Sequence, residues 1–158
     1  MEIAKANVAD PPDIVALVNA YAAQGLMLPR ALSNVYECLR DFFVCRNDGV
    51  LVACAALHVV WEDLGEVRSL AVGEEHKGSG IGRQLVLKCL EEARQLGMRR
   101  VFTLTYVPEF FQKLGFRLYP KEKLPHKVWA DCLNCPKFPD CDEICLLTDL
   151  EEAAPPAA

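Results

Sequence analysis

Two spacings of apolar residues run along the chain, and together they predict both helices and strands. Residues 14–21 and 81–96 repeat apolar side chains every three or four positions, which is typical of helices that pack on one face. Residues 42–46 and 50–60 are almost entirely apolar, as expected of buried strands. They flank residues 47–49, whose sequence Asn-Asp-Gly favours a hairpin turn. The pattern therefore predicts a mixed α/β fold.

The other periodic segments complete the expected order of elements. Further strands are predicted at residues 2–8, 66–72, 101–105, 116–119 and 143–147, and further helices at residues 33–40 and 108–114. Asp10 and Ser33 are the expected N-caps of the first two helices, since their side-chain oxygens can accept hydrogen bonds from free backbone amides. The result is a central sheet of about six to seven strands flanked by about four helices. Residues 1–150 form one predicted domain, and residues 151–158, rich in alanine and proline, a predicted disordered tail.

Composition narrows the class of protein. With 158 residues, of which 52% are hydrophobic and 25% charged, the chain has the size of one globular domain. Its net charge of −5 and the lack of a basic stripe argue against a nucleic-acid partner. No apolar run is long enough to span a membrane, and no signal peptide is visible. These features predict a cytoplasmic protein with a small-molecule substrate, and a homodimer is one open possibility.

A glycine-rich loop between a predicted strand and a predicted helix is the most informative motif. It reads Lys77-Gly-Ser-Gly-Ile-Gly-Arg83. Glycines leave several amides free and let a bulky anion approach the backbone, and the following helix directs its positive dipole end to the same place. The loop lacks the Gly-Lys-Ser/Thr ending of ATP-binding loops, and its glycine spacing differs from that of dinucleotide-binding loops. The motif therefore predicts a phosphate-binding loop of another kind.

This loop resembles the acetyl-CoA loop of the GNAT N-acetyltransferases, which has a basic residue, two further residues, and then Gly-x-Gly. Lys77, Gly80 and Gly82 fill those places. The predicted order of elements resembles the GNAT fold over about residues 2–147, and residues 108–116 are similar to the family's helix beside the coenzyme. The resemblance implies acetyl-CoA as co-substrate. The implied contacts to it are Leu70, Ala71, Val72, Lys77, Gly78, Ser79, Gly80, Ile81, Gly82 and Arg83.

Four segments resemble the acetyltransferase domain of N-acetylglutamate synthases, and more narrowly its short, single-domain bacterial form. These segments are residues 25–30, 66–72, 104–105 and 124–129. The resemblance implies acetylation of the α-amino group of an amino acid, L-glutamate in the first place, for arginine biosynthesis. A dicarboxylic substrate needs fixed guanidinium or ammonium groups. The candidates for that role are Arg30, Arg68 and Lys127.

Glu66 is the candidate catalytic residue. It begins the strand on which many of these enzymes place a carboxylate general base, which would accept the ammonium proton directly or through water. Phe111 departs from the family pattern, because a tyrosine often serves there as the general acid for the coenzyme thiolate. Phenylalanine cannot donate a proton, so the acid must be another group or water. Tyr106 is near in sequence but is expected to pack at the end of a strand.

Three functions remain open from the sequence. The first is an enzyme that acetylates glutamate or a close relative such as glutamine. The second is a GNAT enzyme acting on another small amine or on a protein N-terminus, and it predicts that Arg30 and Lys127 do not converge on one pocket. The third is a non-catalytic module that senses acyl-CoA, which the phenylalanine at position 111 leaves open.

The eight cysteines fall into two groups. Four lie singly in apolar segments and are expected to be buried thiols in a reducing compartment: Cys38, Cys45, Cys54 and Cys89. The other four are spaced C-x2-C-x5-C-x3-C and comprise Cys132, Cys135, Cys141 and Cys145. A structural zinc, a redox-active pair and packed thiols all remain open for this second group. Its intervals are shorter than those of two zinc knuckles, so no metal enters the catalytic prediction.

Overall fold

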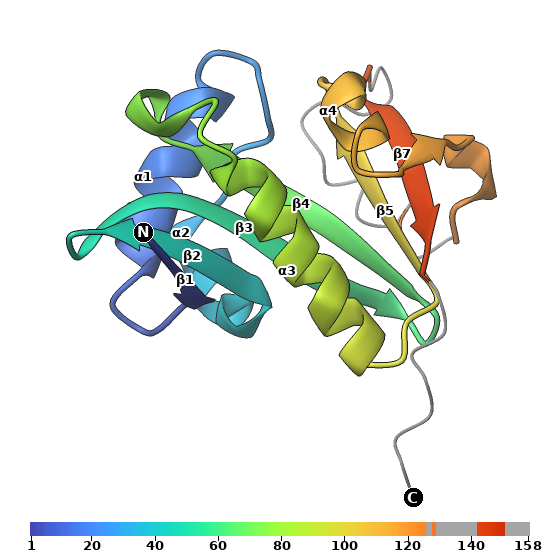
Figure 1. Ribbon diagram of the computed structural model, residues 1–158, viewed down its shortest axis with the longest axis horizontal. Coiled ribbons are helices and arrows are strands. Elements are labelled where there is room, and N and C mark those ends of the chain that lie inside the picture. The colour runs from blue at the N-terminus through green and yellow to red at the C-terminus, as the bar shows by residue number, and fades with distance from the viewer. Residues whose placement is uncertain (126–127, 129–141, 151–158) are drawn as a thin grey trace, which may run out of the picture.

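The central feature of the computed structural model, which describes residues 1–125, 128 and 142–150, is a seven-stranded mixed sheet with helices on both faces (Figure 1). The strands lie in the order β1-β2-β3-β4-β5-β7-β6. They are β1 (Glu2–Lys5), β2 (Phe42–Asn47), β3 (Val50–Trp61), β4 (Leu64–Val72), β5 (Arg100–Thr105), β6 (Arg117–Leu118) and β7 (Ile144–Asp149). The predicted α/β fold with about six to seven strands is confirmed.

The helices join these strands in the expected places. The α-helices of the described residues are α1 (Pro11–Ala22), α2 (Leu32–Glu37), α3 (Ile81–Gln95) and α4 (Pro108–Gln112). Short 3₁₀ turns are η1 (Leu39–Asp41), η2 (Glu74–His76) and η3 (Lys121–Lys123). Within this part of the chain, no helix combines the length and the apolar character needed to cross a membrane.

Both faces of the sheet are buried, which explains the continuous apolar runs in the sequence. Along β2, Phe42 and Val44 pack in the cluster that contains the apolar face of α1. Phe43 and Cys45, which alternate with them, pack in the cluster that contains the apolar face of α3. The Asp48-Gly49 turn has positive φ at both residues, as the predicted hairpin requires.

The first two helices begin differently from the prediction. Asp10 occupies the N-cap position of α1, but its side chain makes no capping bond. Its carboxylate instead accepts bonds from the Asn7 amide at 2.7 Å and from Arg46 Nη2 at 2.5 Å. The prediction that Ser33 caps α2 is wrong, because the helix begins at Leu32 after Ala31 in an extended conformation. The tertiary ion pair with Arg46 thus replaces a local cap at Asp10.

Strands β4 and β5 pair side by side at one end and then separate (Figure 1). Their parallel register runs only from Leu64 opposite Arg100 to Glu66 opposite Phe102 in the described residues. At the point of separation, the buried Thr103 donates its hydroxyl to the carbonyl of Val67 at 2.9 Å. A side-chain hydrogen bond therefore takes over where the backbone ladder stops.

We expect Thr103→Val to lower the free energy of unfolding by about 1–3 kcal/mol, measured by urea titration. The substitution nearly keeps the side-chain volume but removes the donor to the Val67 carbonyl in a buried position. Thr148→Val is the control, since its hydroxyl makes only a 3.5 Å contact to the Gly115 carbonyl, and its effect should stay within about 0.5 kcal/mol. Equal stability of wild type and Thr103→Val would mean that this hydrogen bond does not hold the strands at their separation.

Candidate functional site

The separation of β4 and β5 opens a cavity of about 1120 Å³. Its walls come from the segment between α1 and α2, from β4, from the glycine-rich loop, and from the ends of β5 and α4. Ligand pockets commonly measure about 300–1,000 Å³, so this one has room for a large coenzyme and a second small molecule. The cavity is therefore the candidate site.

The glycine-rich loop forms one end of the cavity. Gly78 and Gly80 have φ of +80° and +87°, a conformation that other residues adopt at a cost. Gly80 is the N-cap of α3, whose first turn carries no acidic residue. At Gly82, a Cβ would lie 3.5 Å from the ring of Phe110, in ordinary contact. The loop thus places the start of α3, with the positive end of its helix dipole, at the cavity.

Most of the predicted coenzyme contacts line this cavity. They are Leu70, Ala71, Val72, Lys77, Gly78, Gly80, Ile81, Gly82 and Arg83. Ser79 instead donates its hydroxyl to the carbonyl of His76 within the loop. Lys77 is held at the rim, where its ammonium lies 3.1 Å from Glu74 Oε1 and 4.5 Å above the Tyr21 ring. The hydrogen bond to Glu74 raises the pKa of Lys77.

Arg30 and Arg68 line the same cavity, and both have unsatisfied donors. Among the described residues, Arg30 Nε and Nη2 and Arg68 Nε are buried without a hydrogen-bond partner. Arg30 Nη1 lies 3.4 Å from the hydroxyl of Ser69. Buried donors without partners are costly, and an anionic ligand with several oxygens would satisfy them.

The backbone around Arg30 is fixed by one side chain of α1. The amide of Arg30 donates to Asn19 Oδ1 at 2.8 Å, and Asn19 Nδ2 donates to the carbonyl of Arg30 at 3.0 Å. The guanidinium lies over the Phe42 ring, 5.7 Å from its centroid. Burial, and next the positive charge of Arg68, lower the pKa of Arg30. A negatively charged ligand would relieve both effects.

Glu66 lies in β4 on the cavity wall, with its side chain 15% exposed. Its Oε1 is 3.8 Å from Arg68 Nη1, and its backbone is in register with His58 of β3. A partly buried carboxylate beside a guanidinium is suited to accept a proton from a substrate held in the same cavity. The structure thus brings Arg30, from the segment between α1 and α2, into the same cavity as Glu66 and Arg68 of β4.

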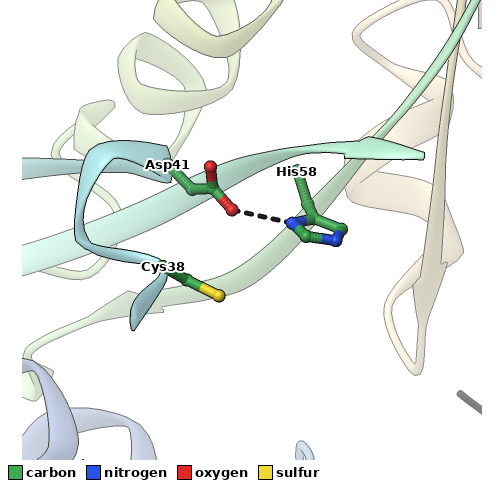
Figure 2. Close-up of side chains that lie close together, drawn as sticks. All are labelled: Cys38, Asp41 and His58. Atoms are coloured by element: carbon green, nitrogen blue, oxygen red, sulfur yellow. Dashed lines mark hydrogen bonds and ion pairs between the residues drawn. The ribbon is translucent and has the colours of Figure 1, made fainter. Parts of the chain in front are cut away.

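A cluster of Cys38, Asp41 and His58 borders the cavity and was not predicted from the sequence (Figure 2). Figure 2 shows the His58 ring turned toward Asp41, with Nδ1 2.7 Å from Oδ2. Cys38 is half-buried and lines the cavity with His58, which corrects the expectation that this thiol is buried in the core. The pairing of a turn with a strand 17 residues away leaves no signal in local spacing.

The remaining predicted residues lie in the core, at the end of β5 or outside the described residues. Phe111 is 3% exposed and packs edge-on against Phe110 and Phe116, so it fills the core beside the cavity. Tyr106 donates its hydroxyl to Asp142 Oδ1 at 2.6 Å. Lys127, Cys132, Cys135 and Cys141 lie outside the described residues, as does the predicted tail at 151–158.

Among the cysteines that the structure describes, four have buried thiols: Cys45, Cys54, Cys89 and Cys145. For the first three this confirms the expectation of core thiols. Burial raises the pKa of Cys45, and it raises the pKa values of Cys54, Cys89 and Cys145 to about 12. These thiols are therefore protonated at neutral pH and serve as small apolar residues.

Comparisons with known proteins point to one family. The family model described as Acetyltransferase (GNAT) family matches residues 17–116. An uncharacterized N-acetyltransferase of Chlorobaculum tepidum is 40% identical over 148 residues, which are 94% of this chain and 96% of that protein. An amino-acid acetyltransferase of Mycobacterium tuberculosis is 41% identical over 117 residues, covering 72% of this chain and 67% of that protein.

A solved structure agrees with these sequence matches. The N-acetylglutamate synthase of Neisseria gonorrhoeae, complexed with coenzyme A and N-acetyl-glutamate, superimposes with a TM-score of 0.88 at 28% identity. The match covers 96% of this chain and 35% of that synthase, so the chain spans about a third of the larger protein.

If the loop binds the pyrophosphate of coenzyme A, Gly80→Asp should raise the Kd for the coenzyme about 30- to 1,000-fold, or about 2–4 kcal/mol. The new side chain would strain a backbone with φ of +87° and place a negative charge at the start of α3. Isothermal titration calorimetry measures the change.

Gly49→Asp is the matched control for this experiment. Gly49 has a similar φ of +81° and open space around its Cβ position, but it lies in the β2–β3 turn. Its substitution should leave the coenzyme Kd unchanged. A folded Gly80→Asp variant that binds the coenzyme as tightly as wild type would contradict the assignment of the loop.

Proposed function

The chain belongs to the GNAT family of acetyltransferases, and on that basis we propose that it acetylates the α-amino group of L-glutamate. As an acyltransferase of this family it uses acetyl-CoA as co-substrate. The observation that carries the choice of amino acid is the pair of arginines, Arg30 and Arg68, whose buried donors lack partners among the described residues. The relation to N-acetylglutamate synthases supports a role in arginine biosynthesis.

The coenzyme would lie along the open side of β4. Its pyrophosphate would bind at the loop between residues 77 and 83, where glycine amides and the start of α3 meet. Beyond Glu66, β4 no longer pairs with β5 in the described residues, so its edge faces the cavity. The amide groups of the pantetheine arm could add to this edge as a further strand would. That placement directs the thioester toward the middle of β4.

The amino acid would bind on the other side, between the segment before α2 and β4. A dicarboxylic substrate carries two anionic groups, and Arg30 and Arg68 present guanidinium groups in one cavity. Charge-assisted hydrogen bonds between carboxylate and guanidinium would satisfy their buried donors. Asn19 fixes the backbone of Arg30 from both sides, so the site is organised before the substrate arrives. The proposed contribution of Lys127 stays a prediction.

Glu66 would act as the general base in the transfer. It accepts a proton from the ammonium group directly or through water, and the free amine then attacks the thioester carbonyl carbon. The carbon–sulfur bond breaks as the new amide forms, the coenzyme leaves as a thiolate, and the attacking nitrogen releases its extra proton to water. Because Phe111 cannot supply a proton, the thiolate takes its proton from water or from another side chain of the cavity.

An assay with acetyl-CoA and a panel of amino acids, following free thiol, tests the proposal. L-Glutamate should give the highest kcat/KM, with glutamine and aspartate below it. Glutamine lacks the negative charge of the side chain, and the side chain of aspartate is shorter. Preference for glutamine would keep the enzyme but change its substrate. No turnover with any amino acid, together with tight coenzyme binding, would favour a different amine substrate or a coenzyme-binding module.

Arg30→Ala should raise the KM for glutamate about 30- to 1,000-fold, because removing one partner of a buried, charge-assisted contact costs about 2–4 kcal/mol. The Kd for acetyl-CoA should stay near that of wild type. Arg117→Ala is the control, since Arg117 is exposed and pairs with Asp149 at the surface. Equal losses for both ligands would indicate misfolding, and no loss for either would remove Arg30 from the site.

Glu66→Gln should lower kcat about 10²- to 10⁴-fold at neutral pH, the usual size of a general-base contribution. The substitution keeps the size of the side chain but removes the proton acceptor. Part of the rate should return as pH rises, because more substrate is then present as free amine. Glu91→Gln, an exposed position of α3, should keep wild-type kinetics. A Glu66→Gln enzyme with unchanged turnover and pH profile would contradict the proposed base.

A further inference from the structure

The cluster of Cys38, Asp41 and His58 holds three different kinds of metal-binding atom in one place (Figure 2). The Cys38 thiol, one Asp41 carboxylate oxygen and one His58 ring nitrogen all lie within 4.8 Å of one another. Figure 2 shows the three side chains converging from a turn and a neighbouring strand. All three residues are half-buried.

The local backbone explains why these side chains meet. Cys38 is the C-cap residue between α2 and η1, and the amide of Asp41 in η1 donates to its carbonyl at 2.9 Å. In a 3₁₀ turn, residues three apart project from the same side, so Cys38 and Asp41 present their side chains together. His58 of β3 approaches that side and forms its 2.7 Å contact with Asp41. The three ligand atoms are therefore set by the backbone of η1 and β3 rather than by flexible loops.

We propose that Cys38, Asp41 and His58 bind a divalent zinc ion. Thiolate, imidazole and carboxylate are the ligands that zinc takes in proteins, at about 2.0–2.3 Å from the metal. Tetrahedral geometry at those distances places ligand atoms about 3.3–3.8 Å apart. To adopt this geometry, the ligand atoms that lie furthest apart would move closer together, and the His58–Asp41 contact would lengthen by about 1 Å.

The charges around the cluster are compatible with such an ion. The Cys38 thiolate and the Asp41 carboxylate would together balance its two positive charges. The guanidinium of Arg68 lies beside the cluster, with Nη2 4.0 Å from the Cys38 sulfur. Glu66 lies 3.8 Å from Nη1 of the same guanidinium and offsets its charge. The ion would therefore add little uncompensated charge to the cavity wall.

Three protein ligands also leave a fourth position for water or another small ligand. Cys38 and His58 both line the cavity, so that ligand can come from the cavity itself. The cysteines at positions 132, 135 and 141 lie more than 70 residues further along the sequence and outside the described residues, so the test below treats them as a second group of thiols.

The test is a titration of the full-length protein, first stripped with a chelator, with zinc and with cobalt(II) as a spectroscopic substitute. Wild type should bind one equivalent at this site, and the cobalt form should show a thiolate-to-metal charge-transfer band. His58→Gln and Asp41→Asn should each weaken zinc binding by at least about 10- to 100-fold. Loss of a residue that only hydrogen-bonds a metal ligand already costs that much, and these two residues would bind the metal directly. Cys38→Ser should remove the charge-transfer band.

Two controls separate this site from other metal ligands. Asp63→Asn removes an exposed carboxylate and should leave zinc affinity unchanged. Cys135→Ser removes a thiol of the C-terminal group and should leave the charge-transfer band in place. If Cys135→Ser abolishes the band while Cys38→Ser retains it, the metal lies in the C-terminal segment and the proposal is wrong. A wild-type protein that binds no zinc would overturn it equally, and that measurement needs no variant to fold.

Discussion

The limited pairing of β4 with β5 is the constraint on which the rest of the structure depends. Three register pairs hold the strands together, and beyond them the buried hydroxyl of Thr103 bonds the carbonyl of Val67 in place of a backbone donor. If the backbone pairing continued, β5 would occupy the edge of β4 along its whole length and no cavity would form between the two strands. Because it stops, the glycine loop, Glu66 and the arginine pair all face one space.

Features with a local cause were predictable from the sequence. The β2–β3 hairpin follows from Asp48-Gly49, whose two positive φ angles few other residue pairs adopt readily. The extent of α3 follows from apolar spacing that continues from Ile81 almost to the glycine at position 97. The start of α3 follows from Gly80, which takes a positive φ at the N-cap position. In each case the information lies within a few residues.

Features that depend on tertiary contacts were not predictable. Asp10 has the right residue type for a helix cap, but Arg46 of β2 takes its carboxylate. Nothing near Arg30 in the sequence indicates that Asn19 fixes its backbone or that Arg68 stands beside it. His58 reads as one polar residue in an apolar strand until η1 brings Asp41 against it. These contacts join segments that only the folded sheet places together.

The bulge at Ser69 has a consequence for the length of the chain. Ser69 has a φ of +56°, and the register with β3 shifts between Cys54 and Ala56. Val67 before it and Val72 after it pack on the α3 face, while Ala71 packs on the α1 face, although strict alternation would put Val67 and Ala71 together. The extra residue of the bulge thus reverses the alternation of side chains between the two faces of β4. Deleting one residue at the bulge would move each residue after it in β4 to the opposite face of the sheet. The number of residues in this strand is therefore as constrained as their identity.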